Sequence, residues 1–263
     1  MDPIEEHPIR RYESGRASAA RDKVVAETRI ELEVNGGQAR AALLCLPRDL
    51  EALAVGLLVG EGALRRREDL KSVTADPAGR KVTVLGDLDA DALDAMNRRW
   101  RWAAGCGGGG TGRDLDAPPF TPVGAGPEIA PERLIELARQ FQGAGALWRQ
   151  TGGVHACALA GPESVLFLAE DVGRHNAFDK VIGLAALDGV ERSDKLVITT
   201  GRLSAEIVSK AVACGVGLLA SRSAVTGLAV ELAKRFGLTL VGFLRGKRMN
   251  VYTGYHRVIE DGQ

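Results

Sequence analysis

The last third of the chain alternates short apolar segments with amphipathic ones, and this alternation is the feature that most constrains the fold. Apolar runs at 195–199, 216–220 and 238–244 predict strands, and helical periodicity at 203–214 and 226–236 predicts the helices between them. Strands that are apolar along their whole length are buried on both faces, and this strand–helix order makes them parallel neighbours. We therefore expect an α/β fold with a parallel sheet covered by helices.

The first part of the chain predicts a smaller α+β domain at 23–99. Apolar and charged residues alternate over 30–34, which is the period of a half-buried strand. Asn35-Gly36 follows and predicts a tight hairpin into a return strand at 41–46. A further strand is expected around 81–85.

Two segments without a regular pattern divide the chain. Residues 1–22 are polar and charged and lack the apolar stretch of a secretion signal, so we expect a flexible leader. Residues 100–126 are rich in glycine and proline and predict a long loop. The larger α/β domain is expected to occupy 127–263.

The charge balance excludes some classes of partner. Lys+Arg and Asp+Glu both number 34, so the formal net charge is zero. A neutral chain is not expected to bind nucleic acid or an anionic membrane by bulk electrostatics. Since no apolar run reaches the roughly 20 residues of a membrane span, we expect a cytoplasmic protein without a membrane partner.

Four widely spaced cysteines stand at 45, 106, 157 and 214, with no Cys-x-x-Cys pair. This spacing fits neither a disulfide framework nor a tetrahedral zinc site, so we expect no structural metal. Cys106 has glycine on both sides, which suits a thiolate that receives a group from one partner and delivers it to another. An incidental exposed thiol is the equally weighted alternative. Cys157, two residues after His155, is expected to be a small core residue.

The carboxyl ends of the three C-terminal strands each carry an arginine. The turns are Thr199-Thr200-Gly201-Arg202, Ser221-Arg222-Ser223 and Arg245-Gly246-Lys247-Arg248, which we call the basic edge. Ligands of open α/β sheets gather at this edge, and guanidinium groups match phosphate geometry. We favour a site for a phosphorylated or dinucleotide ligand over three sets of solvated arginines.

A compact polar cluster, Asp171, Arg174 and His175, follows the strand expected at 165–169. An acid, a base and an imidazole this close together are candidates for acid–base work or for tuning the pKa of a neighbour. A loop held by an Asp–Arg pair, with Asn176 as the helix cap, is the alternative with equal weight.

Several motifs together resemble proteins of the FdhD type, the formate dehydrogenase accessory sulfurtransferases. The clearest is the ungapped block Glu170–Lys180. The other matching segments are Thr151–Ala156, Gly201–Ser204, Ala229–Ala233 and Gly242–Thr253, with weaker similarity at Gly60–Gly62 and around Cys106. The resemblance covers nearly the whole chain beyond residue 22.

The resemblance implies a specific activity. Such proteins accept sulfur as a cysteine persulfide from a cysteine desulfurase and pass it to the bis(molybdopterin guanine dinucleotide) molybdenum cofactor of formate dehydrogenase. They are homodimers with a cytidine-deaminase-like C-terminal domain, a three-layer arrangement of sheet and helices. Cys106 would then carry the persulfide, and Asp171, Arg174 and His175 would be auxiliary. The cofactor-binding residues would be Phe243, Leu244, Arg245, Gly246, Lys247 and Arg248, with Gly201, Arg202, Ser221 and Arg222 from the other turns.

One position departs from the family pattern. The loop of the family has two cysteines spaced as Cys-Gly-x-Cys, and Gly109 stands where the second would be. Transfer by a single thiol is still chemically sufficient. A chaperone that escorts the cofactor without moving sulfur is the main rival interpretation. A zinc-dependent deaminase is disfavoured because its Cys-x-x-Cys pair and its glutamate near the histidine are missing.

Overall fold

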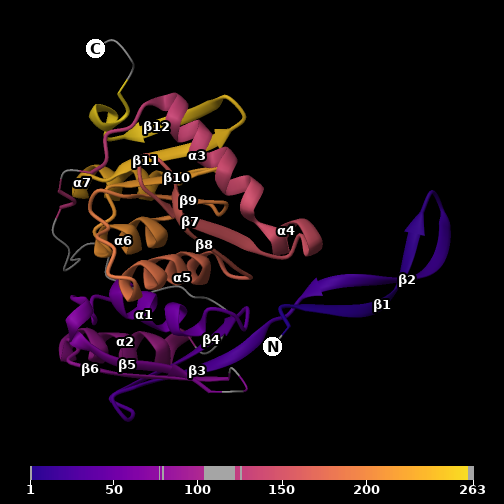
Figure 1. Ribbon diagram of the computed structural model, residues 1–263, viewed down its shortest axis with the longest axis horizontal. Helices are drawn as coiled ribbons and strands as arrows, with labels where there is room; N and C mark the ends of the chain where they lie inside the picture. Colours follow the sequence, from indigo (N-terminus) through magenta and orange to yellow (C-terminus); the bar gives the residue numbers. More distant parts are fainter. Residues whose placement is uncertain (1, 77, 79, 104–121, 125, 260–263) are drawn as a thin grey trace.

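The computed structural model describes residues 2–76, 78, 80–103, 122–124 and 126–259. The molecule has a body of two sheets with their helices and a two-stranded hairpin that projects away from it (Figure 1). The smaller sheet is built from the N-terminal part of the chain and the larger one from the C-terminal part, which confirms a mixed α/β architecture with a small N-terminal sheet region.

The projecting hairpin, which we call the arm, consists of β1 (Ile4–Glu13) and β2 (Arg16–Val25) in antiparallel pairing. The expectation of a flexible leader at 1–22 is therefore wrong. The turn between the strands explains the difference, because Ser14 and Gly15 both have positive φ, 49° and 78°. Two positive φ values match the twist of a two-residue hairpin, and the Ser-Gly dipeptide was the missed signal.

The N-terminal sheet has four strands in the order β4-β3-β6-β5. Their bounds are β3 Thr28–Val34, β4 Ala39–Cys45, β5 Leu70–Ala75 and β6 Lys81–Gly86. The hairpin between β3 and β4 is confirmed, since Asn35 and Gly36 have φ values of 47° and 67°. Strand β5 was not expected from the sequence.

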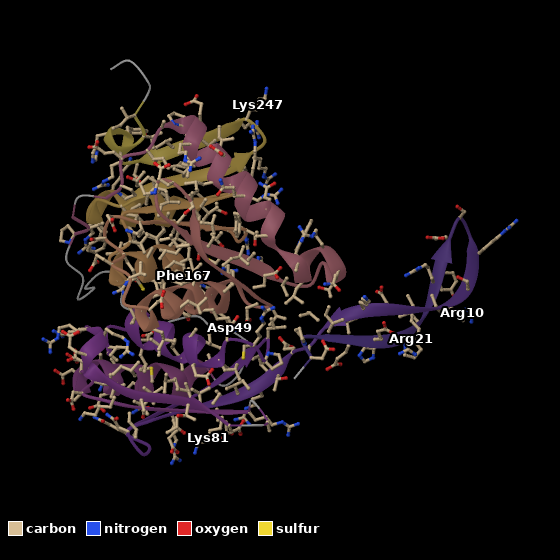
Figure 2. The ribbon with its side chains drawn as sticks, in the orientation of Figure 1. Arg10, Arg21, Asp49, Lys81, Phe167 and Lys247 are labelled. Carbon is tan, nitrogen blue, oxygen red and sulfur yellow. The ribbon has the colours of Figure 1, made fainter. Side chains whose placement is uncertain are left out.

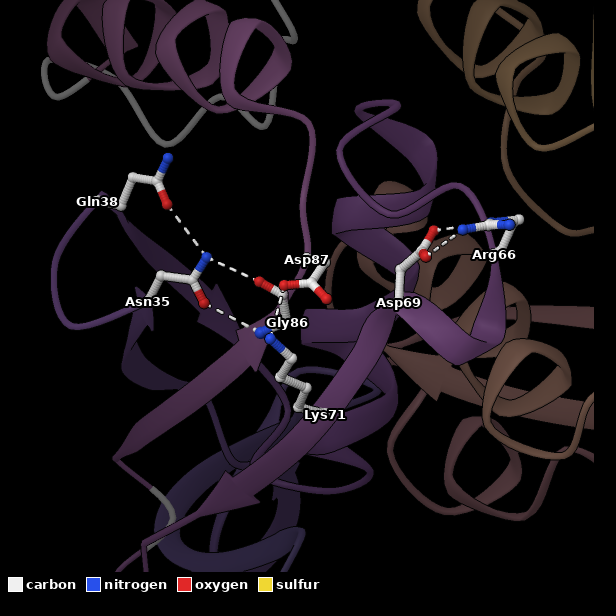
Figure 3. A network of polar contacts seen from close by, with 7 residues as sticks. All are labelled: Asn35, Gln38, Arg66, Asp69, Lys71, Gly86 and Asp87. Carbon is white, nitrogen blue, oxygen red and sulfur yellow. Dashed lines mark hydrogen bonds and ion pairs between the residues drawn. The ribbon is translucent and has the colours of Figure 1, made fainter.

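Asn35 also connects this hairpin to the end of β6, the strand that pairs with β3 (Figure 3). Its Nδ2 donates to the Gly86 carbonyl at 3.0 Å and its Oδ1 accepts from the Gly86 N–H at 3.0 Å. Three helical segments complete the domain: α1 Leu50–Gly60, the 3-10 helix η1 Arg67–Asp69, and α2 Ala90–Ala103. Helix α2 extends to Ala103, so residues 100–103 belong to a helix and not to the loop expected at 100–126.

The C-terminal sheet has six strands in the order β12-β11-β10-β9-β7-β8. Their bounds are β7 His155–Ala160, β8 Val165–Asp171, β9 Leu196–Thr199, β10 Leu218–Ser221, β11 Thr239–Arg245 and β12 Arg248–Thr253. Strands β9, β10 and β11 are parallel as predicted. Strands β7 and β12 run antiparallel to their neighbours, so the sheet is mixed rather than fully parallel.

Helices cover both faces of this sheet (Figure 1). Their bounds are α3 Pro131–Ala144, α4 Ala146–Thr151, α5 Arg174–Leu187, α6 Ala205–Ala213 and α7 Gly227–Phe236, followed by the 3-10 helix η2 Tyr255–Arg257. Alternate residues of a strand point to opposite faces. Ile198 of β9 accordingly packs with Phe141 of α3, and Val197 packs in the cluster that holds α5, α6 and α7.

One hydrophobic core spans both parts of the chain. It contains Leu32 of β3, Leu58 of α1 and Phe178 of α5, all buried. Helices α1 and α5 approach closely because Gly56 and Gly183 stand at their crossing. The N-terminal sheet and the C-terminal sheet are therefore joined through two helices rather than by a thin contact.

Candidate functional site at the carboxyl edge of the large sheet

The three turns of the basic edge lie together, as the parallel strands require. The Arg222 N–H donates to the Thr199 carbonyl at 3.2 Å, and the Ser221 hydroxyl donates to the Gly201 carbonyl at 2.6 Å. The Arg245 guanidinium donates to the Arg222 carbonyl and so joins the third turn to the second. Backbone and side-chain hydrogen bonds thus fix the relative positions of the turns.

The cations of this edge are accessible. Arg202, Arg245, Lys247 and Arg248 are exposed, and Lys247 projects from the turn between β11 and β12 (Figure 2). Arg222 is half-buried, and its Nε has no hydrogen-bond partner in the described part of the chain. Of the residues expected to bind a cofactor, Gly201, Ser221 and Leu244 are buried, and Leu244 belongs to the core beneath the edge.

Phe243 adopts a left-handed backbone conformation, with φ of 51°. A non-glycine residue in this region is strained, and such strain gathers at functional sites. The register between β11 and β12 shifts between Gly242 and Arg245, and a bulge of this kind re-aims the side chains beside it. The Arg245 guanidinium consequently lies 5.7 Å from the centre of the Phe243 ring.

The junction between β8 and α5 reaches the same edge. Because β7 is antiparallel to both β8 and β9, the end of β8 points the same way as the end of β9. Arg174 lies directly over Gly201, where an added Cβ would come within 2.9 Å of the Arg174 Cβ. His155, at the start of β7, has its Nδ1 3.3 Å from the Thr200 hydroxyl. The two polar motifs and the basic edge therefore belong to one region.

Asp171 is held entirely by groups inside the protein. It is fully buried and forms an ion pair with the fully buried Lys180, at 2.7 Å between Oδ2 and Nζ. Its Oδ2 also accepts from the Leu46 N–H at 3.1 Å, and its Oδ1 accepts from Asn176 Nδ2 at 2.9 Å. Asn176 is the third residue of α5, so the alternative that placed it as the helix cap is wrong, and Gly173 stands at the N-cap.

His175 is a neutral imidazole at this junction. Burial, followed by the charges of Lys210 and Arg174 and by His155, lowers the pKa of His175 to about 3. Its Nε2 lies 3.5 Å from the Glu206 carboxylate and makes no hydrogen bond within the described residues. Glu206 was missed at the sequence level. Its spacing from Lys210, i to i+4 on α6, was the available signal.

The pKa of His175 predicts a pH dependence of stability. An unfolded histidine titrates near pH 6.5, so between about pH 6.5 and 3 the unfolded chain binds a proton at His175 that the folded chain does not. The free energy of unfolding should therefore fall as the pH falls through this window. In His175→Gln this part of the fall should be absent, as measured by urea unfolding at several pH values. The exposed His7→Gln is the control, and equal slopes in His175→Gln and the wild type would contradict the assignment.

The described cysteines are all buried. Burial and the charge of Asp171 raise the pKa of Cys45 to about 12, and burial raises the pKa of Cys157. Cys214 is also in the core. Cys106, the predicted persulfide carrier, lies outside the described residues. Within those residues no group of three or more His, Cys, Asp or Glu side chains is arranged to hold a metal ion.

Comparison with known proteins defines the class. A model of the FdhD/NarQ family matches residues 25–259, so the chain belongs to that family. The chain is 35% identical over 253 residues to the sulfur carrier protein FdhD of Bacillus subtilis, covering 95% of each. It is 37% identical over 238 residues to the protein of that name from Wolinella succinogenes, covering 90% of this chain and 82% of the relative.

A solved structure shares the whole fold. The crystal structure of a protein from Desulfotalea psychrophila, provisionally assigned as a formate dehydrogenase accessory protein, superposes with a TM-score of 0.80. It is 26% identical in sequence and the match covers 98% of this chain and 100% of that one. Among the described residues no helix is long and apolar enough to cross a membrane.

Proposed function

We propose that this chain is a sulfur carrier that accepts sulfur on Cys106 from a cysteine desulfurase and delivers it to a bis(molybdopterin guanine dinucleotide) cofactor for formate dehydrogenase. The observation that carries the proposal is the burial of the other three cysteines. Thiolates are the nucleophiles in sulfur exchange, and Cys45 and Cys157 have raised pKa values. Because the other three cysteines are buried, Cys106 is the cysteine that remains to carry sulfur in the way the family resemblance implies.

Loading of Cys106 is a thiol–persulfide exchange. The Cys106 thiolate attacks the terminal sulfur of the donor's persulfide, a new S–S bond forms on Cys106, and the donor's cysteine leaves as a thiolate. No external oxidant is consumed. Cytoplasmic location and a homodimer are part of the proposal, because the family resemblance implies both.

The basic edge is proposed to hold the phosphates and guanine of the cofactor, which is the substrate. Its accessible arginines, with Arg222 held between the turns, supply donors in a fixed arrangement. The strand order β8-β7-β9-β10-β11, with helices on both faces, supports a cytidine-deaminase-like C-terminal domain. Arg174 and His175 are proposed to support the edge as positioning residues.

Mass spectrometry tests the carrier role. After incubation with a cysteine desulfurase and cysteine, the intact wild-type protein should gain one sulfur atom, and Cys106→Ser should gain none. Cys157→Ala, which alters a buried cysteine, should load like the wild type. Loading of Cys106→Ser to the wild-type level would overturn the proposal.

Nucleotide affinity tests the basic edge. GDP, which shares the guanine and phosphates of the cofactor, should bind about 10-fold more weakly to Arg202→Ala, since one charge-assisted hydrogen bond contributes about 1.5 kcal/mol or more. Arg66→Ala is the matched control, because Arg66 is exposed on the N-terminal domain and pairs with Asp69 (Figure 3). If calorimetric titration gave the same affinity for GDP in the wild type, Arg202→Ala and Arg66→Ala, that result would contradict the placement of the nucleotide at the basic edge.

A cofactor chaperone is the second candidate, and Gly109 in place of the second loop cysteine favours it. Under that function Cys106→Ser restores formate dehydrogenase activity in a cell that lacks this protein. Under the sulfur-carrier function the same variant restores none. Bound GDP in both proteins shows that the variant is folded.

A further inference from the structure

The arm is too small a structure to be complete by itself. A two-stranded hairpin is at best marginally stable in water, and three or more strands are needed for an independent sheet. The base of the arm is anchored, where Ile4 and Val25 pack against Leu46, Leu147 and Val154. Beyond this base both strands extend away from the body (Figure 1). A strand of ten residues is about 30 Å long.

The two edges of the arm differ in their capacity to pair. Strand β1 contains Pro8, which lacks a backbone N–H to donate. Strand β2 has no proline, and its middle, Ala17 to Ala20, is a run of small uncharged residues. Charged side chains and prolines are the usual protection of edge strands, and the middle of β2 has neither.

We propose that β2 pairs with β2 of a second copy of this chain, antiparallel about a twofold axis through Ala19. The two arms then form one four-stranded sheet. The inference deepens the homodimer of the proposed function and rests on it, since it names the segment that joins the two copies.

Charge sets this register. When the axis passes through Ala19, residues whose numbers sum to 38 face each other across the two strands. Arg16 of one copy then lies opposite Asp22 of the other, and the symmetry repeats this pair on the other side of the axis. Within one chain Arg16 makes no ion pair among the described residues, and Asp22 has only Arg11 at 3.8 Å. An axis through Ser18 or Ala20 places neither Arg16 nor Asp22 opposite a charge. Among these three registers, only the one centred on Ala19 places both Arg16 and Asp22 opposite a residue of the opposite charge.

Cysteine cross-linking tests the register. In the Cys106→Ser background, Ala19→Cys places two thiols opposite each other, at a Cα separation of about 5 Å that a disulfide spans. Ala17→Cys is the matched control, because its two copies would lie four residues apart along the sheet, about 13 Å. Mild oxidation should give a covalent dimer of Ala19→Cys and little of Ala17→Cys. Equal cross-linking of both, or of neither, overturns the register.

Removal of the arm separates this inference from the proposed function. A variant in which two glycines replace residues 5–24 keeps Ile4 and Val25 at the base. Light scattering should find the wild type dimeric and this variant monomeric, with unchanged sulfur loading. A variant that stays dimeric overturns the arm as the interface and leaves the carrier function standing. A monomeric wild type overturns both the homodimer and the arm pairing.

Discussion

Lys180→Met is expected to lower the melting temperature by about 10 °C, because removal of one partner from a buried ion pair costs about 3–5 kcal/mol. The variant leaves the Asp171 carboxylate buried without its cation, and it leaves the Leu46 carbonyl without the donor that Lys180 supplies at 3.0 Å. Both groups lie where the N-terminal domain meets α5. Differential scanning calorimetry measures the change.

Two comparisons check the cause. Lys71→Met removes a lysine from an exposed pair with Asp87 and should change the melting temperature by less than 1 °C, as exposed ion pairs contribute little. Asp171→Asn combined with Lys180→Met removes both charges and should be more stable than Lys180→Met alone. A double variant that is less stable than the single one would show that the buried charge is not what destabilises Lys180→Met.

Gly183→Ala is expected to destabilise the protein by about 3 kcal/mol through overpacking at the crossing of α1 and α5. A Cβ at position 183 would lie 1.8 Å from the Ala52 carbonyl oxygen, and one at position 56 would lie 1.7 Å from the Asp179 carbonyl oxygen. Both obstacles are backbone atoms of a packed helix, so the helices themselves must move apart. Urea unfolding measures the loss, and Gly56→Ala should show the same effect.

Gly60→Ala is the control, because Gly60 lies on α1, the helix that also carries Gly56. Its Cβ would meet Asp179 Oδ1 at 3.6 Å, an ordinary contact, and alanine favours a helix over glycine by about 1 kcal/mol. This variant should therefore be as stable as the wild type or more so. If Gly183→Ala matched Gly60→Ala in stability, close helix packing would not explain the two glycines.

The fold was predictable where the residue pattern is strong and local. Near-continuous apolar strands such as Leu196–Thr199 are buried on both faces of the sheet, and that pattern predicts a parallel core. Strand β7 was not predicted, because three of the six residues in His155–Ala160 are alanine, which is depleted in strands. The arm was not predicted either, since its strands are mostly exposed and show no apolar alternation.

The candidate site was predictable in its location and less so in its roles. Parallel strands bring their carboxyl ends to one edge, so Arg202, Arg222 and Arg245 had to lie close together. The charged residues around Asp171 indicated an acid–base role for it. Its partner Lys180 stands nine positions along the chain, and only the fold brings Leu46 into contact with both side chains. Burial of this kind depends on contacts between distant segments, which a single sequence does not contain.

The shared core limits how parts of this protein can be recombined. Because α1 packs into the same interior as α5, an exchange of residues 23–99 between two family members would set a foreign α1 against a native α5. The boundary between the two sheets is thus a poor crossover point for chimeras. A working hybrid would carry α1 and α5 from the same parent, with Leu46, Asp171 and Lys180 inherited as one unit.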